Sequence, residues 1–154
     1  MVLVTRANTG MGFQAALKYA QLRASTLILV VRSVEKGETA KGNILRHVTS
    51  PVTIIIKILD LSTFASVKTF AQDIIKHVSE LHVVQLCAGI MSTSFNLGAE
   101  GYESASQVNV LSTALLALLL FLKVQETAAA ASDDSYMPHI SFLNSMATQD
   151  VLEE

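Results

Sequence analysis

The stretch that most constrains the fold is VLVTRANTGMG, residues 2–12. A short apolar run ends at Thr5, a polar turn follows, and Gly10 and Gly12 precede a helical pattern of apolar residues that begins at Phe13. This order predicts a strand, a glycine-bearing loop and a helix. Such a loop points backbone N–H groups and the positive end of a helix dipole at one spot, which is how α/β proteins hold a nucleotide phosphate.

The composition supports one domain whose strands are buried on both faces. The 154 residues are 51% apolar and 16% charged, which argues against disorder. The formal net charge of −2 gives no electrostatic basis for binding nucleic acid or an acidic membrane, so we expect neither partner. Four scattered histidines offer no second ligand at a suitable spacing, so we expect no metal site.

Three features predict a cytoplasmic protein. The single cysteine, Cys87, excludes an internal disulfide and is typical of a reducing compartment. The first apolar run is short and no basic region precedes it, so we expect no secretory signal. The longest apolar stretch, residues 114–122, is shorter than the roughly 20 residues that span a bilayer, so we expect a buried helix and no membrane span.

The rest of the chain alternates apolar, β-branched runs with helical patterns. Further strands are predicted at residues 26–31, 52–59, 81–87 and 138–144, and further helices at residues 34–48, 62–78 and 102–127. Ser62 is the expected N-cap of the helix that follows it. The alternation predicts an α/β fold, a Rossmann-like doubly wound parallel sheet of about five strands in one domain. We expect the dinucleotide-type strand order 3-2-1-4-5, and the flavodoxin-like order 2-1-3-4-5 is the alternative.

The glycine-bearing loop resembles that of the short-chain dehydrogenase/reductase family, and the resemblance covers almost the whole chain. The family reads Thr-Gly-x-x-x-Gly-x-Gly, and residues 5–12 depart from it only at Arg6. The resemblance implies a cofactor-binding loop made of Thr5, Asn8, Thr9, Gly10, Met11 and Gly12. A non-glycine residue at positive φ costs about 1–2 kcal/mol, so Arg6 is expected to strain this loop and to turn away from the cofactor. The alternative is that its guanidinium pairs with a cofactor phosphate.

The resemblance extends to the ends of the next two strands, where it implies contacts with the adenosine of the cofactor. Arg32 stands where the family reads the ribose, and an arginine there accommodates a 2′-phosphate, so we expect NADP in preference to NAD. A solvated arginine at a strand end is the alternative. Asp60 and Leu61 resemble the family's Asp-Leu pair, whose acid meets the adenine amino group. An ordinary aspartate before a helix is the alternative there.

Three further positions resemble the family's site. The run CAGI at residues 87–90 resembles Asn-Ala-Gly-Ile, which implies that Ala88 and Gly89 lie under the cofactor, while Cys87 is expected to be an inert, buried thiol. Asn109 resembles the helix asparagine that holds a water in the proton relay, and a polar group on a buried helix requires a partner. Ser145 resembles the serine that hydrogen-bonds the substrate carbonyl, and a turn or capping serine is the alternative.

The resemblance implies an oxidoreductase that transfers hydride between NADP and a small-molecule carbonyl or alcohol. The motifs are similar to those of members that act on lipophilic substrates, such as retinol-type and secondary-metabolite reductases. The family's general acid/base is a tyrosine with a lysine four residues later, about a dozen residues after the serine. Here nine residues follow Ser145, and none is tyrosine or lysine.

We therefore expect residues 1–154 to be an incomplete dinucleotide-binding domain, a truncated and catalytically inactive form. One alternative is a non-catalytic nucleotide-binding or interaction module whose leucine-rich helix at residues 102–127 pairs with a second copy or another partner. The other is a fragmentary gene product. In each case the fifth strand is expected to be an edge with unpaired N–H and C=O groups.

Overall fold

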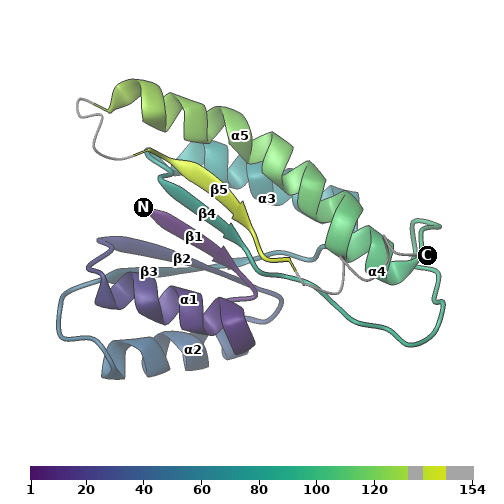
Figure 1. Ribbon diagram of the computed structural model, residues 1–154, viewed down its shortest axis with the longest axis horizontal. Helices are drawn as coiled ribbons and strands as arrows, with labels where there is room; N and C mark the ends of the chain where they lie inside the picture. The colour runs from purple at the N-terminus through teal and green to yellow at the C-terminus, as the bar shows by residue number, and fades with distance from the viewer. Residues whose placement is uncertain (132–136, 145–154) are drawn as a thin grey trace, which may run out of the picture.

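A parallel sheet of five strands organises the computed structural model, which describes residues 1–131 and 137–144 (Figure 1). The strands are β1 (Val2–Thr5), β2 (Thr26–Val31), β3 (Thr53–Ile58), β4 (Val83–Leu86) and β5 (His139–Phe142). Their order is β3-β2-β1-β4-β5, and each neighbouring pair is parallel. The dinucleotide-type order is confirmed and the flavodoxin-like alternative is wrong. The chain changes direction across the sheet between β1 and β4, where open α/β sheets bind their ligands.

Helices cover both faces of the sheet. The helices α1 (Gly10–Gln21) and α2 (Val34–Arg46) lie on one face, and α3 (Phe64–His77) and α5 (Thr113–Ala130) lie on the other (Figure 1). Alternate residues of β1 enter the two apolar cores, since Val2 and Val4 pack on the α1 side and Leu3 packs on the α3 side. A strand buried on both faces has no polar positions to alternate with, which explains the continuous apolar run at the start of the sequence.

The predicted strands were placed well, and the helix starts less well. The bounds of β1 and β2 match the prediction, whereas β3, β4 and β5 are shorter than predicted. The helix α1 begins at Gly10 instead of Phe13, because Thr9 is already its extended N-cap. The N-cap of α3 is Thr63, whose Oγ1 accepts from the Ser66 N–H at 3.3 Å, so the prediction of Ser62 is wrong. Ser62 instead belongs to the preceding turn, where its N–H donates to Asp60 Oδ1 at 2.9 Å.

The predicted helix at residues 102–127 is three segments rather than one. A short α4 (Ser104–Ser106) leads into the π-helix η1 (Gln107–Ser112), and α5 follows. Gln107 is buried, and its Nε2 donates to Ser112 Oγ at 2.9 Å and to Glu100 Oε2 at 3.2 Å. The same Glu100 carboxylate accepts from the Phe64 N–H, so it also closes the start of α3. Apolar periodicity carries no information about these buried polar contacts, so the π-helix was not predicted.

The stretch Ser104–Ala130 is long and apolar enough, by length and composition only, to cross a membrane. Within the domain, however, Leu116 and Leu120 are fully buried in the core that α3 shares. One side of α5 thus packs as a core helix does, but only 33% of the apolar window is buried, so the prediction of a buried helix at residues 114–122 is confirmed for that side alone. The opposite side of α5 is exposed, with Leu118, Phe121 and Leu122 at its surface.

Candidate functional site

The loop between β1 and α1 is built around a glycine that nothing larger can replace. A Cβ on Gly12 would lie 2.4 Å from the carbonyl oxygen of Arg6 and 2.8 Å from that of Thr5. Gly10 adopts a left-handed φ of +56°, and the space beside it is open. The first turn of α1 therefore packs directly on the loop backbone. Because the first N–H groups of a helix have no intrahelical partner, they are available to an anion at this loop.

Thr5 fixes the ends of the two central strands to each other. Its Oγ1 accepts hydrogen bonds from the N–H groups of Cys87 and Ala88, each at 2.9 Å, and the residue is buried. The hydroxyl thus positions the loop after β4 beside the loop after β1. This clamp was not foreseen, although a threonine ending a fully apolar strand is the signal that could have found it. The expected contact of Thr5 with a cofactor stays a prediction.

Arg6 crosses the gap between these two loops. Its backbone has a left-handed φ of 52°, as expected for a residue in the place of the first glycine. Its side chain is exposed, and a guanidinium N–H donates to the carbonyl oxygen of Gly89 in the loop after β4. Although the side chain of Arg6 is exposed, its guanidinium therefore links the loop after β1 to the loop after β4.

Asn109 holds the same loop from the other side. Its Oδ1 accepts from the Ile90 N–H and its Nδ2 donates to the Ile90 carbonyl, both at 2.8 Å. The expected partner is thus the backbone of Ile90, although Asn109 is exposed rather than buried. A Cβ on Gly89 would lie 3.3 Å from Asn109 Oδ1, so the loop passes close under η1. Asn109 is brought to the site, and its expected part in a proton relay stays a prediction.

Arg32 and Asp60 lie at one edge of the sheet because the strands before them are paired. Val31 is registered with Ile58, and the Leu59 N–H donates to the Val31 carbonyl at 3.0 Å. Within residues 1–131 and 137–144, the exposed Arg32 side chain makes no hydrogen bond or ion pair, and Asp60 Oδ1 is used only in its local turn. Leu61 is buried beside them. The predicted contacts with ribose and adenine remain predictions, and Ser145 lies outside the described residues.

Two titratable side chains beside β4, those of Cys87 and Tyr19, have raised pKa values. Burial raises the pKa of the Cys87 thiol, and a hydrogen bond with Gln85 opposes that rise in part. Burial likewise raises the pKa of Tyr19, whose hydroxyl donates to Gln85 Oε1 at 3.4 Å. Neither group provides an anionic nucleophile or base at neutral pH, which agrees with the inert thiol expected for Cys87.

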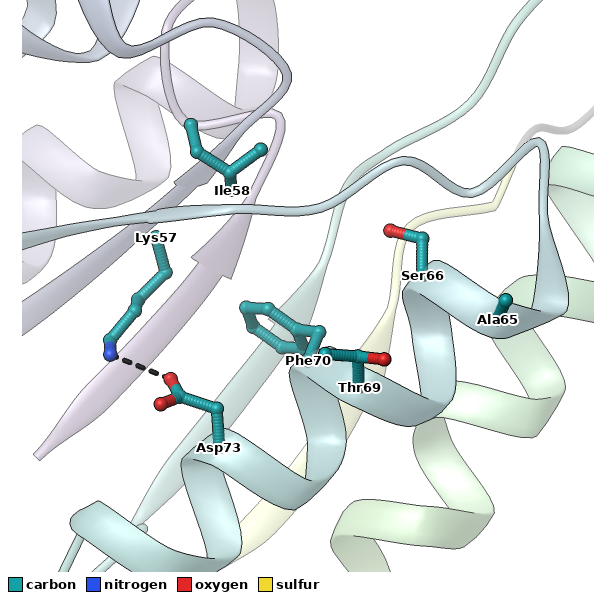
Figure 2. Close-up of a pocket in the computed structure, with 7 residues that line it drawn as sticks. All are labelled: Lys57, Ile58, Ala65, Ser66, Thr69, Phe70 and Asp73. Carbon is teal, nitrogen blue, oxygen red and sulfur yellow. Dashed lines mark hydrogen bonds and ion pairs between the residues drawn. The ribbon is translucent and has the colours of Figure 1, made fainter.

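Two hollows in the surface lie away from these loops. One, of about 500 Å³, lies between β3 and α3, where Lys57 Nζ and Asp73 Oδ2 form an ion pair at 2.6 Å (Figure 2). The other, of about 370 Å³, lies between α5 and β5 and is apolar. The candidate site is instead the crevice between the loops after β1 and β4, which we call the β1–β4 crevice. It is formed by residues 5–12 and 87–90, with Arg32 and Asp60 at one end and Asn109 beside it.

Comparison with known proteins agrees with this geometry. The family model of the short chain dehydrogenases matches residues 1–130. The short-chain dehydrogenase/reductase ffsI of Aspergillus flavipes is 38% identical over 99% of this chain and 44% of its own. Human retinol dehydrogenase 11 is 37% identical over 83% of this chain and 40% of its own. This chain thus spans less than half the length of these two relatives.

Solved structures extend the comparison to the fold. The oxidoreductase yciK from E. coli has a TM-score of 0.72 and 25% sequence identity, over 96% of this chain and 58% of its own. The aligned part includes the parallel sheet and therefore the strand ends that form the β1–β4 crevice. With the family match over residues 1–130, these findings show that the chain belongs to the short-chain dehydrogenase family, whose members use NAD or NADP.

Proposed function

We propose that these 154 residues supply the cofactor-binding part of an NADP-preferring oxidoreductase that acts on a carbonyl or alcohol of a lipophilic small molecule. The observation that carries the proposal is the close packing of α1 on the loop after β1, which we call the cradle. A Cβ on Gly12 would lie 2.4 Å from the carbonyl oxygen of Arg6 in this loop. Such close approach leaves the N-terminus of α1 free to face a phosphate, so the residues present fit a dinucleotide. The bound cofactor supplies the hydride, and the protein supplies orientation.

The preference for NADP rests on Arg32. A carboxylate at the end of β2 would accept the 2′-hydroxyl of NAD, whereas a guanidinium presents a planar fork to a 2′-phosphate. Arg32 has no partner among the described residues to compete for that role. Asp60 follows the adjacent strand, and we propose that it accepts a hydrogen bond from the adenine amino group. Thr5 and Asn109 hold the loop at residues 88–90, so the far side of the crevice keeps its shape.

The proposed substrate class rests on the resemblance and on one relative. Human retinol dehydrogenase 11, by its name, acts on a lipophilic alcohol, and it is 37% identical over 128 residues. The 154 residues contain no tyrosine followed by a lysine four positions later, so we propose that they bind the cofactor without turning over substrate. A single cysteine, Cys87, is typical of a reducing compartment, and we propose the cytoplasm.

The test is a titration of the purified 154-residue chain with NADPH and, separately, with NADH. The sequence has no tryptophan, so nicotinamide fluorescence is observed with little background. We expect saturable binding with a lower dissociation constant for NADPH. Unchanged emission up to millimolar cofactor would remove the binding proposal. A panel of lipophilic carbonyl compounds is then added with NADPH, and consumption above a control without protein would contradict the proposed lack of turnover.

A second candidate function, self-association, is favoured by the outer side of α5. Leu118 and Leu122 are 72% and 65% exposed, and the neighbouring hollow between α5 and β5 is apolar. We propose that this side pairs with a second copy of the chain, which would remove apolar surface from water. Size-exclusion chromatography with light scattering should give a dimer, and Leu118→Glu should give a monomer. A wild-type monomer across the accessible concentrations would exclude this candidate.

A further inference from the structure

We infer that Arg6 is a gate on the β1–β4 crevice, and that its contact with Gly89 must open before a dinucleotide can lie across it. The inference rests on the proposed function, since it concerns access of the cofactor to the same loops. It goes beyond that function because it assigns control of cofactor affinity to one side chain, that of Arg6.

The backbone of Arg6 is held in place on both sides. Its carbonyl oxygen lies against the α-carbon of Gly12 and accepts the Thr9 N–H at 3.5 Å. The next residue, Ala7, donates its N–H to the Val30 carbonyl at 3.3 Å. Arg6 therefore keeps its left-handed φ of 52° whether or not its side chain is engaged. Only the side-chain torsions remain free to move the guanidinium.

The loop that receives the guanidinium is also anchored. Thr5 Oγ1 accepts the N–H of Ala88 at 2.9 Å, and Asn109 forms two hydrogen bonds with the backbone of Ile90. Gly89 lies between these two anchors and turns its carbonyl oxygen to Arg6. The contact thus joins two fixed loops across the gap between them, and it occupies the place where the rule for open α/β sheets puts the ligand.

The contact is of a kind that opens readily. The Arg6 side chain is exposed, and its partner is a neutral carbonyl rather than a carboxylate. One solvent-exposed hydrogen bond shifts an equilibrium by about 2- to 10-fold, and a closed crevice weakens apparent binding by the fraction that is open. Arg6 is therefore expected to lower cofactor affinity by about this factor without abolishing binding.

The alternative is that Arg6 pairs with a cofactor phosphate once the cofactor is bound. That role and the gate predict opposite signs for removal of the side chain. As a gate, Arg6→Gly should bind NADPH about 2- to 10-fold more tightly than wild type. As a phosphate ligand, the same variant should bind more weakly. Arg6→Met keeps the left-handed strain and the length of the side chain but cannot donate to Gly89, so the gate predicts a gain for it as well.

The experiment is an NADPH fluorescence titration of the 154-residue chain as wild type, Arg6→Gly and Arg6→Met, with circular dichroism to confirm folding. Tighter binding of both Arg6→Gly and Arg6→Met than of wild type supports the gate, whereas a gain for Arg6→Gly alone assigns the effect to side-chain bulk or backbone strain and overturns the gate. Equal or weaker binding of Arg6→Gly overturns the gate and leaves the proposed function standing. Absence of binding by all three contradicts the proposed function, and the gate fails with it.

A second readout tests the contact without cofactor. Amide hydrogen exchange followed by mass spectrometry should be faster at residues 88–91 in Arg6→Gly, because one of the three anchors of this loop is lost. Exchange within β4 should stay unchanged. Unchanged exchange at residues 88–91 would show that Arg6 does not hold the loop, and the gate would be rejected on that ground.

Discussion

Two regions of the molecule, the β1–β4 crevice and the flank formed by α5 and β5, differ in how far their side chains find partners among the described residues. At the β1–β4 crevice, Thr5, Arg6 and Asn109 are each engaged with backbone groups of the loop after β4. At the flank formed by α5 and β5, Leu118 and Phe142 are exposed beside an apolar hollow, and β5 is paired only with β4 among the described strands.

This difference follows from where the elements of the two regions lie along the chain. The crevice is formed by the first β-α-β unit, the ends of β3 and β4 and Asn109 of η1, which lie within residues 1–109. The flank consists of the last elements described, and chains of this family that are about twice as long align with this one. The loop around Gly12 is held by contacts within the chain, whereas the outer side of α5 is exposed. Cofactor binding and the packing of α5 can therefore be tested separately.

The largest expected effect is a loss of stability that distinguishes the buried side of α5 from its exposed side. Leu116 is fully buried, so Leu116→Ala should lower the free energy of unfolding by about 2–5 kcal/mol. Leu118 is 72% exposed, and Leu118→Ala should change it by less than about 0.5 kcal/mol. Urea unfolding followed by circular dichroism measures both. Similar losses for the two variants would mean that the outer side of α5 is already covered in solution.

A somewhat smaller loss is expected at the cradle. Gly12→Ala places a methyl group 2.4 Å from the Arg6 carbonyl oxygen, so it should destabilise the fold by about 2–4 kcal/mol and abolish NADPH binding. Gly42→Ala is the matched control, because no atom lies within 4 Å of the added Cβ and alanine is favoured inside α2 by about 1 kcal/mol. If Gly12→Ala binds NADPH as wild type does, α1 does not start against the loop as described.

Thr5→Val tests the clamp between β1 and β4. Valine keeps the shape but leaves the buried N–H groups of Cys87 and Ala88 without their acceptor, so the free energy of unfolding should fall by about 1–3 kcal/mol. Thr9→Val is the control, since the Thr9 side chain makes no capping hydrogen bond. A loss at Thr5 no greater than at Thr9 would show that Ala88 and Cys87 find other acceptors.

Apolar patterning was sufficient to predict the five strands, most clearly for β1 and β2, whose residues are almost all buried. The run Thr26–Val31 was bounded correctly at both ends, whereas the alternation of strands and helices fits two strand orders, of which the expected dinucleotide-type order is confirmed. Gly12 was predicted from its spacing in the loop motif. A side chain at this position would clash with the loop backbone, so only glycine fits there. Local periodicity therefore captured what the backbone requires at short range.

Contacts between residues distant in sequence were not predictable in the same way. The clamp of Thr5 on Cys87 and Ala88 joins residues about 80 positions apart, and the Glu100 carboxylate reaches the Phe64 N–H at the start of α3. The engagement of Arg6 with Gly89 likewise arises only when β1 and β4 are neighbours. Single-sequence patterns identify these residues as unusual, but not their partners.

The smallest expected effect distinguishes recognition of the cofactor from the stability of the crevice. Arg32 is exposed and unpaired within the described residues, so Arg32→Ala should leave the free energy of unfolding within about 0.5 kcal/mol of wild type. The same change should weaken NADPH binding by about tenfold, the effect of losing one charge-assisted contact of roughly 1.5 kcal/mol, and should leave NADH binding unchanged. Lys36→Ala, in the exposed first turn of α2, is the control for loss of one positive charge nearby. Equal losses for NADPH and NADH would mean that Arg32 does not read the 2′-phosphate, and the preference for NADP would then have no basis in the sequence.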